Sequence, residues 1–189
     1  MKRILLFATF IFSISIFVLG NQAGTLVTAG KAGPFKVGMT VGEAKAVSPD
    51  YKYSRTSDGE GIALVAVEKA GKLIFTFYAG EEDPDAPLNE KAVIEHIQVW
   101  DSAFKTKEGV GPGTPIKDAE VTYGKVKEIM LSEIEAREYI EFMNSPKAIT
   151  MRIEGAGIFE GSSRKTAKYR SGAKIRSLII NGDGTETNV

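Results

Sequence analysis

Residues 62–79 read IALVAVEKAGKLIFTFYA, two apolar runs on either side of Ala70-Gly71. The first run is rich in Val and Ile, and the second alternates so that Leu73, Phe75 and Phe77 share one face of a strand. A connection this short joins antiparallel neighbours, because parallel strands need a much longer crossover. The segment therefore predicts a β-hairpin within an antiparallel sheet.

Short helices and further strands extend outward from this hairpin. Thr40-Val41-Gly42-Glu43 is a capping box that starts a helix over 41–47, ending before Pro49. Thr114 suits the N-cap of a second helix, and Pro115 suits its first turn. Helices so short and few cannot cover both faces of a parallel sheet, so we expect an α+β fold, an antiparallel β-sheet with two short helices on one face. The expected elements are helices 41–47 and 116–122, strands 51–55, 62–69, 72–79, 92–101, 125–131, 137–143, 148–154 and 173–180, and a long polar loop over 155–172.

The second half of the sequence resembles the first. If small insertions are allowed, Val37-Gly38, Thr40 and Glu43-Ala44 correspond to Val110-Gly111, Thr114 and Asp118-Ala119. Two degenerate repeats of a helix plus strands are therefore an open alternative to a single domain without repeats.

The amino terminus has the form of a secretory signal. Lys2 and Arg3 precede an apolar run over 4–19, which is shorter than the roughly 20 residues that a membrane span needs. We expect residues 1–20 to be a signal peptide cleaved after Gly20 or Ala29, with an uncleaved anchor as the alternative. Residues 21–33 are then a linker, 34–180 a single domain and 181–189 a flexible tail. Either reading places the domain outside the cytoplasm, in the periplasm or secreted.

Composition excludes several kinds of site. The 189 residues include 24 basic, 24 acidic and no cysteine residues. Removing Lys2 and Arg3 with the signal leaves 22 basic against 24 acidic residues, so no overall field favours nucleic acid. Without cysteine there is no disulfide framework, thiolate zinc site or cysteine nucleophile.

Three stretches resemble chemical sites but are better interpreted as structure. His96 is the only histidine, and a triad or a zinc site needs further groups, so we interpret it as a sheet-face residue. The acidic run over 81–85 lacks the alternating ligands of a calcium loop, which favours a solvated turn. The glycine-rich segment 109–114 opens a helix but lacks the GK[ST] ending of a phosphate loop, which favours a structural turn. We expect no catalytic residue, metal or cofactor.

A basic stretch near the carboxyl end is the strongest candidate for a binding surface. From Gly161 to Ile180 there is no acidic residue. Such a patch can bind an acidic protein surface or an anionic glycolipid, while the alternative is a solvated loop with a charged edge strand. Its members are Arg164, Lys165, Lys168, Tyr169, Arg170, Lys174 and Arg176.

The segment from Ile94 to Ser102, continuing from Glu108 to Pro115, resembles the sigma-E (RpoE)-regulated envelope lipoproteins of unknown function. That family has an I-x-x-I-x-V-x-D-S strand followed by a G-V-x-x-G-T-P helix entry. The resemblance covers about residues 33–180 and implies an envelope α+β domain without catalytic residues to carry over. This chain lacks the lipid-bearing cysteine, so the resemblance does not imply lipid anchoring.

The sequence leaves two functional hypotheses. In the first, a non-enzymatic exported protein binds another envelope protein or an anionic glycolipid through the basic stretch, with Tyr169 exposed among the cations. In the second, a small-ligand carrier or inhibitor uses the open sheet face near Trp100, Tyr78 and His96. An enzyme is the least favoured class, because the usual sets of nucleophile, base and metal ligands are missing.

Overall fold

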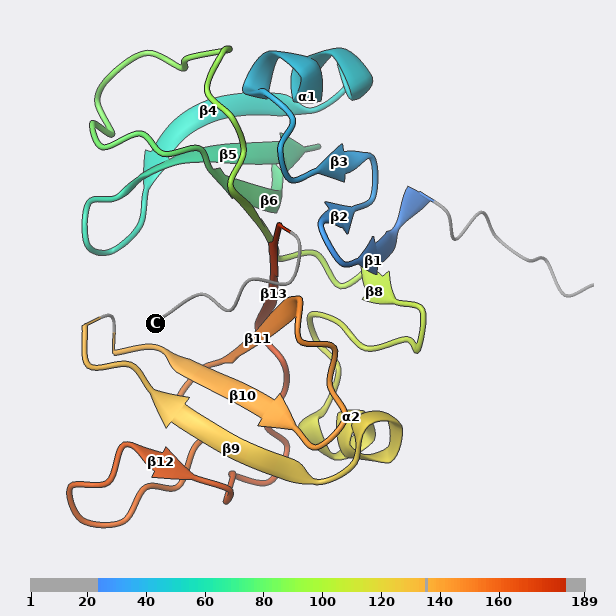
Figure 1. Ribbon diagram of the computed structural model, residues 1–189, viewed down its shortest axis with the longest axis vertical. Helices are drawn as coiled ribbons and strands as arrows, with labels where there is room; N and C mark the ends of the chain where they lie inside the picture. The colour runs from blue at the N-terminus through green and yellow to red at the C-terminus, as the bar shows by residue number, and fades with distance from the viewer. Residues whose placement is uncertain (1–23, 135, 183–189) are drawn as a thin grey trace, which may run out of the picture.

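The computed structural model describes residues 24–134 and 136–182 (Figure 1). The proposed signal peptide and residues 183–189 of the predicted tail lie outside these residues. The prediction that the tail starts at Asn181 is wrong, because Asn181 is buried and ends the last strand. The elements in chain order are β1 (Leu26–Thr28), β2 (Lys31–Ala32), β3 (Phe35–Lys36), α1 (Val41–Val47), β4 (Lys52–Ser57), β5 (Ala63–Lys69), β6 (Lys72–Tyr78), β7 (His96–Val99), β8 (Lys105–Thr106), α2 (Ile116–Tyr123), β9 (Val126–Leu131), β10 (Glu138–Phe142), β11 (Ile149–Ile153), β12 (Lys165–Thr166) and β13 (Ser177–Asn181).

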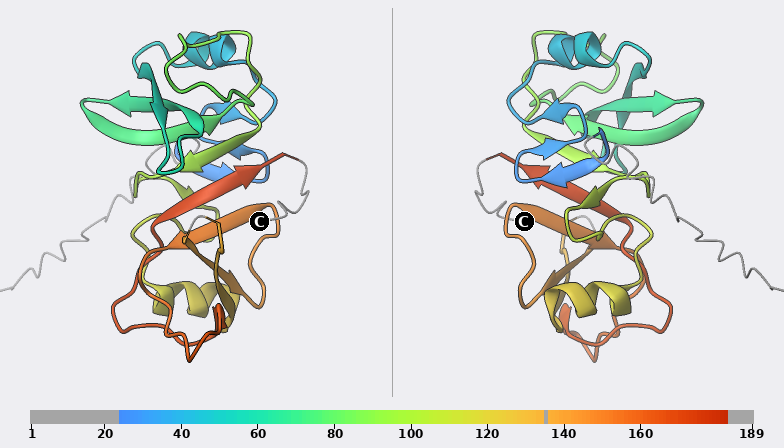
Figure 2. Two further views of the ribbon diagram at one scale, coloured as in Figure 1. Left: turned by 90° about the vertical axis from the view of Figure 1, so that its left-hand side faces the viewer. Right: turned by 90° about the vertical axis from the view of Figure 1, so that its right-hand side faces the viewer.

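One long sheet organises the molecule, confirming the predicted antiparallel α+β fold. Its strand order is β12-β9-β10-β11-β13-β7-β6-β5-β4. The sheet bends into two lobes, with β4–β6 in the upper lobe and β9–β12 in the lower lobe of Figure 1. Figure 2 shows β13 crossing between the lobes, where it pairs with β7.

The predicted hairpin over 62–79 forms β5 and β6. Ala70 and Gly71 both have positive φ, 50° and 75°, as a tight hairpin turn of the I′ type requires. Phe75 and Phe77 are fully buried, but Leu73 does not share their face as predicted and lines the open side with Tyr78. The reason is a register shift between Val67 and Glu68, which leaves Ile74 as an extra residue in β6. The hairpin thus has one face in the core and the other toward open space.

The core lies on one side of the long sheet, with both helices. Buried side chains from α1, α2 and the strands form one continuous cluster, and a small sheet of order β3-β2-β1-β8 adds to it. The opposite side opens between the lobes, at the left of Figure 1. Within the described residues, no helix has the length and hydrophobicity that a membrane span requires.

The small sheet corrects the predicted linker over 21–33. From residue 24 onward this segment belongs to the fold: β1 pairs in parallel with β8 and antiparallel with β2. Val27 and Ala32 are 1% and 0% exposed, so both are core residues. The linker prediction failed because β1 depends on a partner that is distant in the sequence.

The first helix matches its prediction, and the second differs at its start. In α1, Glu43 N donates to Thr40 Oγ1 at 3.1 Å and Thr40 N donates to Glu43 Oε2 at 2.8 Å, which completes the capping box. In α2 the N-cap is Pro115 and not Thr114, and it provides no side-chain hydrogen bond. The Thr114 hydroxyl instead accepts from Gly111 N at 3.0 Å and so shapes the loop before the helix.

Two predicted strands are shorter than expected, for the same reason in each half. Residues 92–94 and 173–175, which lie upstream of β7 and β13, bond to the helix entries. These bonds are Gly38 N to Ile94 O (2.8 Å) and Val41 N to Ala92 O (3.0 Å) in the first half, and Gly113 N to Ile175 O (2.8 Å) and Ile116 N to Ala173 O (2.9 Å) in the second.

This shared pattern establishes how the two halves correspond. Gly113 minus Gly38 and Ile116 minus Val41 both give 75 positions, so no insertion separates the helix entries. The expected insertions are therefore wrong: Gly38 corresponds to Gly113 and not to Gly111. Gly38 and Gly113 also share a positive φ, 90° and 82°.

The pairing of β7 with β13 relates the halves by an approximate two-fold. Ile97 pairs with Ile180, Val99 with Leu178 and Gln98 with Ile179. If the edge strand β12 is left aside, β7 and β13 are each the fourth strand of the long sheet that follows a helix. A two-fold axis that passes near the pair of Gln98 and Ile179 would produce this register. The long sheet is thus two four-stranded units, β4–β7 and β9–β11 with β13, plus β12 at one edge.

Candidate functional site

The open face of the long sheet forms a cleft of about 1070 Å³ between the two lobes. Strands from both units supply its floor, and the β4–β5 and β9–β10 connections form its lips (Figure 1). The floor and walls combine aromatic, polar and charged side chains, notably Thr76, Tyr78, His96, Gln98, Trp100, Tyr139 and Arg152.

Trp100 is the large aromatic side chain of this floor. Its Nε1 donates to Thr76 Oγ1 at 3.0 Å, which fixes the orientation of the indole. The guanidinium carbons of Arg152 and Arg176 lie 5.7 Å and 5.4 Å from its ring centroid, within the range of cation–π attraction. Two arginines and a tryptophan therefore converge where the units meet.

His96 lies at the other end of β7 from Trp100, with Gln98 between them, and lines the cleft on the open face as predicted. Its ring stacks on Tyr78 with centroids 5.0 Å apart and an interplanar angle of 19°. Among residues 24–134 and 136–182, no group of three or more His, Asp or Glu side chains could hold a metal ion. The arrangement offers aromatic and hydrogen-bonding contact.

An ion pair crosses the mouth of the cleft. Arg137 Nη2, from the β9–β10 connection, donates to Asp58 Oδ2, from the β4–β5 connection, at 2.9 Å. Burial of the Asp58 carboxylate acts to raise its pKa, but the hydrogen bonds from Arg137 and from the amides of Ile62 and Glu60 outweigh burial, so the pKa lies below its ordinary value. Both charges are thus retained at neutral pH.

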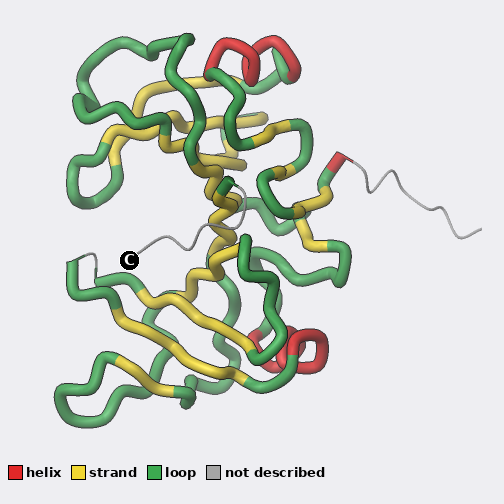
Figure 3. The backbone as a smooth tube through the Cα atoms, viewed as in Figure 1, coloured by secondary structure: helices red, strands yellow, loops and turns green. Residues whose placement is uncertain are grey.

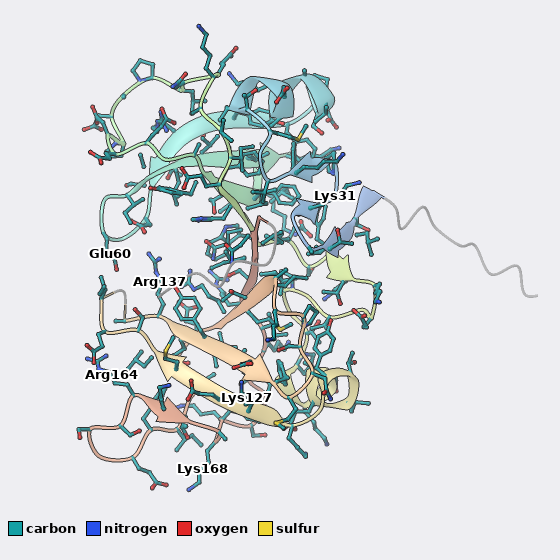
Figure 4. All side chains as sticks on the ribbon, viewed as in Figure 1. Lys31, Glu60, Lys127, Arg137, Arg164 and Lys168 are labelled. Carbon is teal, nitrogen blue, oxygen red and sulfur yellow. The ribbon has the colours of Figure 1, made fainter. Side chains whose placement is uncertain are left out.

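Most of the basic stretch lies away from the cleft, around β12 and the loops that flank it (Figure 3). None of Arg164, Lys165, Lys168, Tyr169 and Arg170 lines the cleft, whereas Arg176, at the end of the same stretch, lies against Trp100. Figure 4 labels Arg164 and Lys168 on this lower part of the molecule.

Acidic neighbours partner most of these cations. The ion pairs are Lys165–Glu128 (3.0 Å), Lys168–Glu160 (2.6 Å), Arg164–Glu133 (3.5 Å) and Arg176–Glu154 (3.4 Å). Tyr169 is half-buried and not exposed as expected, because its hydroxyl donates to Glu120 Oε2 at 2.9 Å and its ring packs against the core. Acids from other parts of the chain therefore offset the charge of a stretch that contains none.

The other two sequence candidates have structural roles. Glu81, in the acidic run, makes a bidentate pair with Arg55 at 2.6 Å and 2.7 Å, which ties this loop to β4. In the glycine-rich loop, a Cβ at Gly111 would lie 2.3 Å from the carbonyl oxygen of Phe104. Glycine is required there for close packing of the backbone.

The sequence indicates Trp100 and, in the basic stretch, Arg176, but not the other residues of the floor. Arg152 and Tyr139 are a cross-strand pair in β11 and β10. The alternation of β11, with Ile149, Met151 and Ile153 buried, could have placed Arg152 on the open face. Nothing local indicates that Asp58 and Arg137, 79 positions apart, would meet.

Comparison with known proteins supports the fold alone. This α+β architecture has been seen before: a crystal structure of the uncharacterized protein yfeY from Escherichia coli superposes with a TM-score of 0.56 at 13% identity. The match covers 83% of this chain and 99% of that chain. No protein-family model matches the sequence, and no curated protein matches it significantly. The chain thus shares its fold with an uncharacterized protein, which agrees with the expectation of a domain of unknown function.

Proposed function

We propose that the protein is an exported, non-enzymatic binding module that holds a segment of another envelope protein in the cleft. The observation that carries this proposal is the contact of Trp100 with Arg152 on the cleft floor, which Tyr78 and Tyr139 also line. Trp, Tyr and Arg are the residue types that dominate binding energy in protein interfaces, where they cluster near the centre.

The size and the lips of the cleft favour a protein segment over a small ligand. Small-molecule sites usually enclose roughly 300–1,000 Å³, and this cleft is at or above that range. Apolar side chains stand exposed on both lips, Ile62 at 40% and Ile134 at 85%. An extended segment or loop could contact both lips and the floor at once.

The basic stretch gives weaker support to an anionic glycolipid as the partner. Its ion pairs are solvent-exposed, and such pairs contribute little to stability, so a ligand could displace them. However, any anionic ligand would compete with carboxylates already in place, such as Glu128 and Glu160. We therefore assign partner binding to the cleft.

Export rests on the sequence. Lys2 and Arg3 followed by the apolar run over 4–19 have the form of a secretory signal, and the periplasm or the exterior is the compartment we propose. The partner is accordingly a protein of the same compartment, and neither a cofactor nor a catalytic step is part of the proposal.

The test is crosslinking in the native envelope followed by quantitative co-purification. We expect Trp100→Ala and Ile134→Asp each to reduce recovery of the same partner at least tenfold. Ile134 is 85% exposed, so that variant tests a lip without disturbing the core. As the matched control, the combined Arg164→Ser, Lys165→Ser, Lys168→Ser and Arg170→Ser variant should retain the partner.

Other outcomes would redirect the assignment. Loss of the partner in the basic-stretch variant alone would show that the cleft is not the binding site. Partner binding would then be assigned to the surface around β12. A stoichiometric small mass that stays on the wild-type protein in native mass spectrometry, and is lost in Trp100→Ala, would make the protein a small-ligand carrier instead. The unfolding midpoint of every variant should be measured so that loss of fold is not mistaken for loss of binding.

A further inference from the structure

We propose that Asp58 and Arg137 form a latch that holds the two lips of the cleft together and must be released to admit the partner. This inference concerns the regulation of the cleft and rests on the proposed function for its biological meaning. In Figure 4, Glu60 and Arg137 mark the two lips, which face each other across the mouth.

The geometry of Asp58 suits it to this task. Its Oδ1 accepts from Glu60 N at 3.0 Å and from Ile62 N at 2.9 Å, so the loop orients the carboxylate in advance. Its Oδ2 is left to accept from Arg137 Nη2 at 2.9 Å. The side chains are only 13% and 20% exposed, so the lips are close enough to shield the pair from much of the solvent.

The approximate two-fold brings the β4–β5 and β9–β10 connections, which hold equivalent places in the two units, together at the mouth. Asp58 directly follows β4 and Arg137 directly precedes β10, so the pair joins positions that are not equivalent. The bonds from Asp58 N to Ile62 O and from Ser132 N to Arg137 O show that the equivalent positions are Ser132 and Ile62. These two side chains carry no charge, so the repeat of this contact that symmetry would allow is not an ion pair.

The sheet itself joins the units by contacts of a different kind. β7 and β13 share a backbone ladder, and Gln98 Nε2 donates to Ser177 Oγ at 2.8 Å on the floor. The ladder and this hydrogen bond do not depend on charge and lie where the sheet bends. A polar contact at the mouth can therefore open while the sheet stays paired, since an ion pair released to water regains its hydration.

The absence of cysteine in the 189 residues permits a direct distance measurement. Spin labels on Glu60→Cys and Ile134→Cys, one on each lip, report the opening by double electron–electron resonance in the full chain purified from its own envelope. With Asp58 and Arg137 intact, we expect a single narrow distribution that broadens toward longer distances as salt is raised, because salt screens the pair.

Variants separate the charge from the loop geometry. Asp58→Asn keeps an acceptor for the two amides but removes the charge, and we expect its distribution to shift by several ångströms toward longer distances. Arg137→Gln should do the same, whereas Arg137→Lys, which keeps the charge, should stay close to wild type. Lys69→Gln, which breaks an ion pair with Asp50 inside the upper lobe, is the matched control and should change nothing.

The decisive result is the distribution in Asp58→Asn. If it coincides with that of the wild type, or if the Lys69→Gln control opens to the same extent, the latch is wrong. This measurement needs no partner, so it can succeed or fail independently of the co-purification test. Where both hold, Asp58→Asn should recover the crosslinked partner several-fold more efficiently than wild type.

Discussion

Asp101 illustrates how a single carboxylate couples charge to the stability of the fold. It follows β7, and its Oδ1 accepts from Ala103 N at 2.7 Å, while Lys72 Nζ lies 2.6 Å from Oδ2. Burial acts to raise the pKa of Asp101, but the hydrogen bonds from Lys72 and Ala103 outweigh burial, so its pKa is lowered. The native state therefore favours the ionised form.

The sign of the pH dependence follows from this lowered pKa. The stabilisation is fully present above the unfolded-state pKa of about 4 and is lost as the pH falls through the lower folded-state pKa. We expect Asp101→Asn to reduce the free energy of unfolding by about 1–3 kcal/mol at pH 7, the usual cost of losing a charged hydrogen bond. The difference from wild type should shrink in acid, as measured by urea unfolding across the pH range.

The exposed Glu82→Gln variant is the control for a general charge effect and should follow wild type throughout. A cost for Asp101→Asn that is equal at neutral and at acid pH would show that packing, and not charge, explains the role of Asp101.

At the level of the elements, the two helices show how far the repeats have diverged. Thr40 in the first unit corresponds to Pro115 in the second, by the same offset of 75 that relates Val41 to Ile116. Thr40 closes a capping box, whereas Pro115 contributes a fixed φ and no side-chain bond. Equivalent positions thus start equivalent helices by different chemistry.

This difference predicts which helix start is sensitive to mutation. Thr40→Ala removes the hydroxyl that accepts from Glu43 N, so we expect a loss of about 1 kcal/mol in the free energy of unfolding. Thr40→Ser keeps the hydroxyl and should remain within a few tenths of a kcal/mol of wild type. Chemical denaturation measures both, and an equal loss in the two variants would contradict a capping role.

The same elements show which parts of the fold could be predicted. The helices and the hairpin over 62–79 depend on neighbouring residues, so capping and alternation identified them. Strand β1 and the shortened β7 depend on partners distant in the sequence, and no local pattern reveals such partners. The candidate site could also be predicted only in part. Trp100 lies in a predicted strand, but the acids that offset the basic stretch come from other elements.

At the scale of the whole molecule, the cleft is a consequence of the repeat. Two units that pair through β7 and β13 must bend away from the shared core, and the space between them becomes the open face. Residues at the axis, such as Gln98 and Ile179, lie at its floor, and the hairpin tips lie at its mouth. Specificity at the mouth could then arise because the two tips carry different side chains, as Arg137 in one tip and Ile62 at the equivalent place in the other illustrate.

The extent of the fold also bears on how the proposed signal is processed. Cleavage after Ala29 would remove β1, whose pairing with β8 is supplemented by the bond from Lys105 N to Thr25 O at 3.1 Å. It would also delete Val27, which is 1% exposed, and leave Ala32 and Phe104 without that neighbour in the core cluster. Loss of a buried aliphatic side chain costs about 2–5 kcal/mol, so we expect the folded product to keep β1.

Cleavage after Gly20 preserves every element of the fold, which predicts Asn21 as the first residue of the mature protein. Mass spectrometry of the intact protein from its own envelope measures this end directly. A chain truncated to begin at Gly30 serves as the comparison and should unfold at a lower temperature than one that begins at Asn21. The prediction is wrong if the mature protein begins at Gly30 and unfolds at the same midpoint temperature as the longer chain. That result would show that β1 is dispensable.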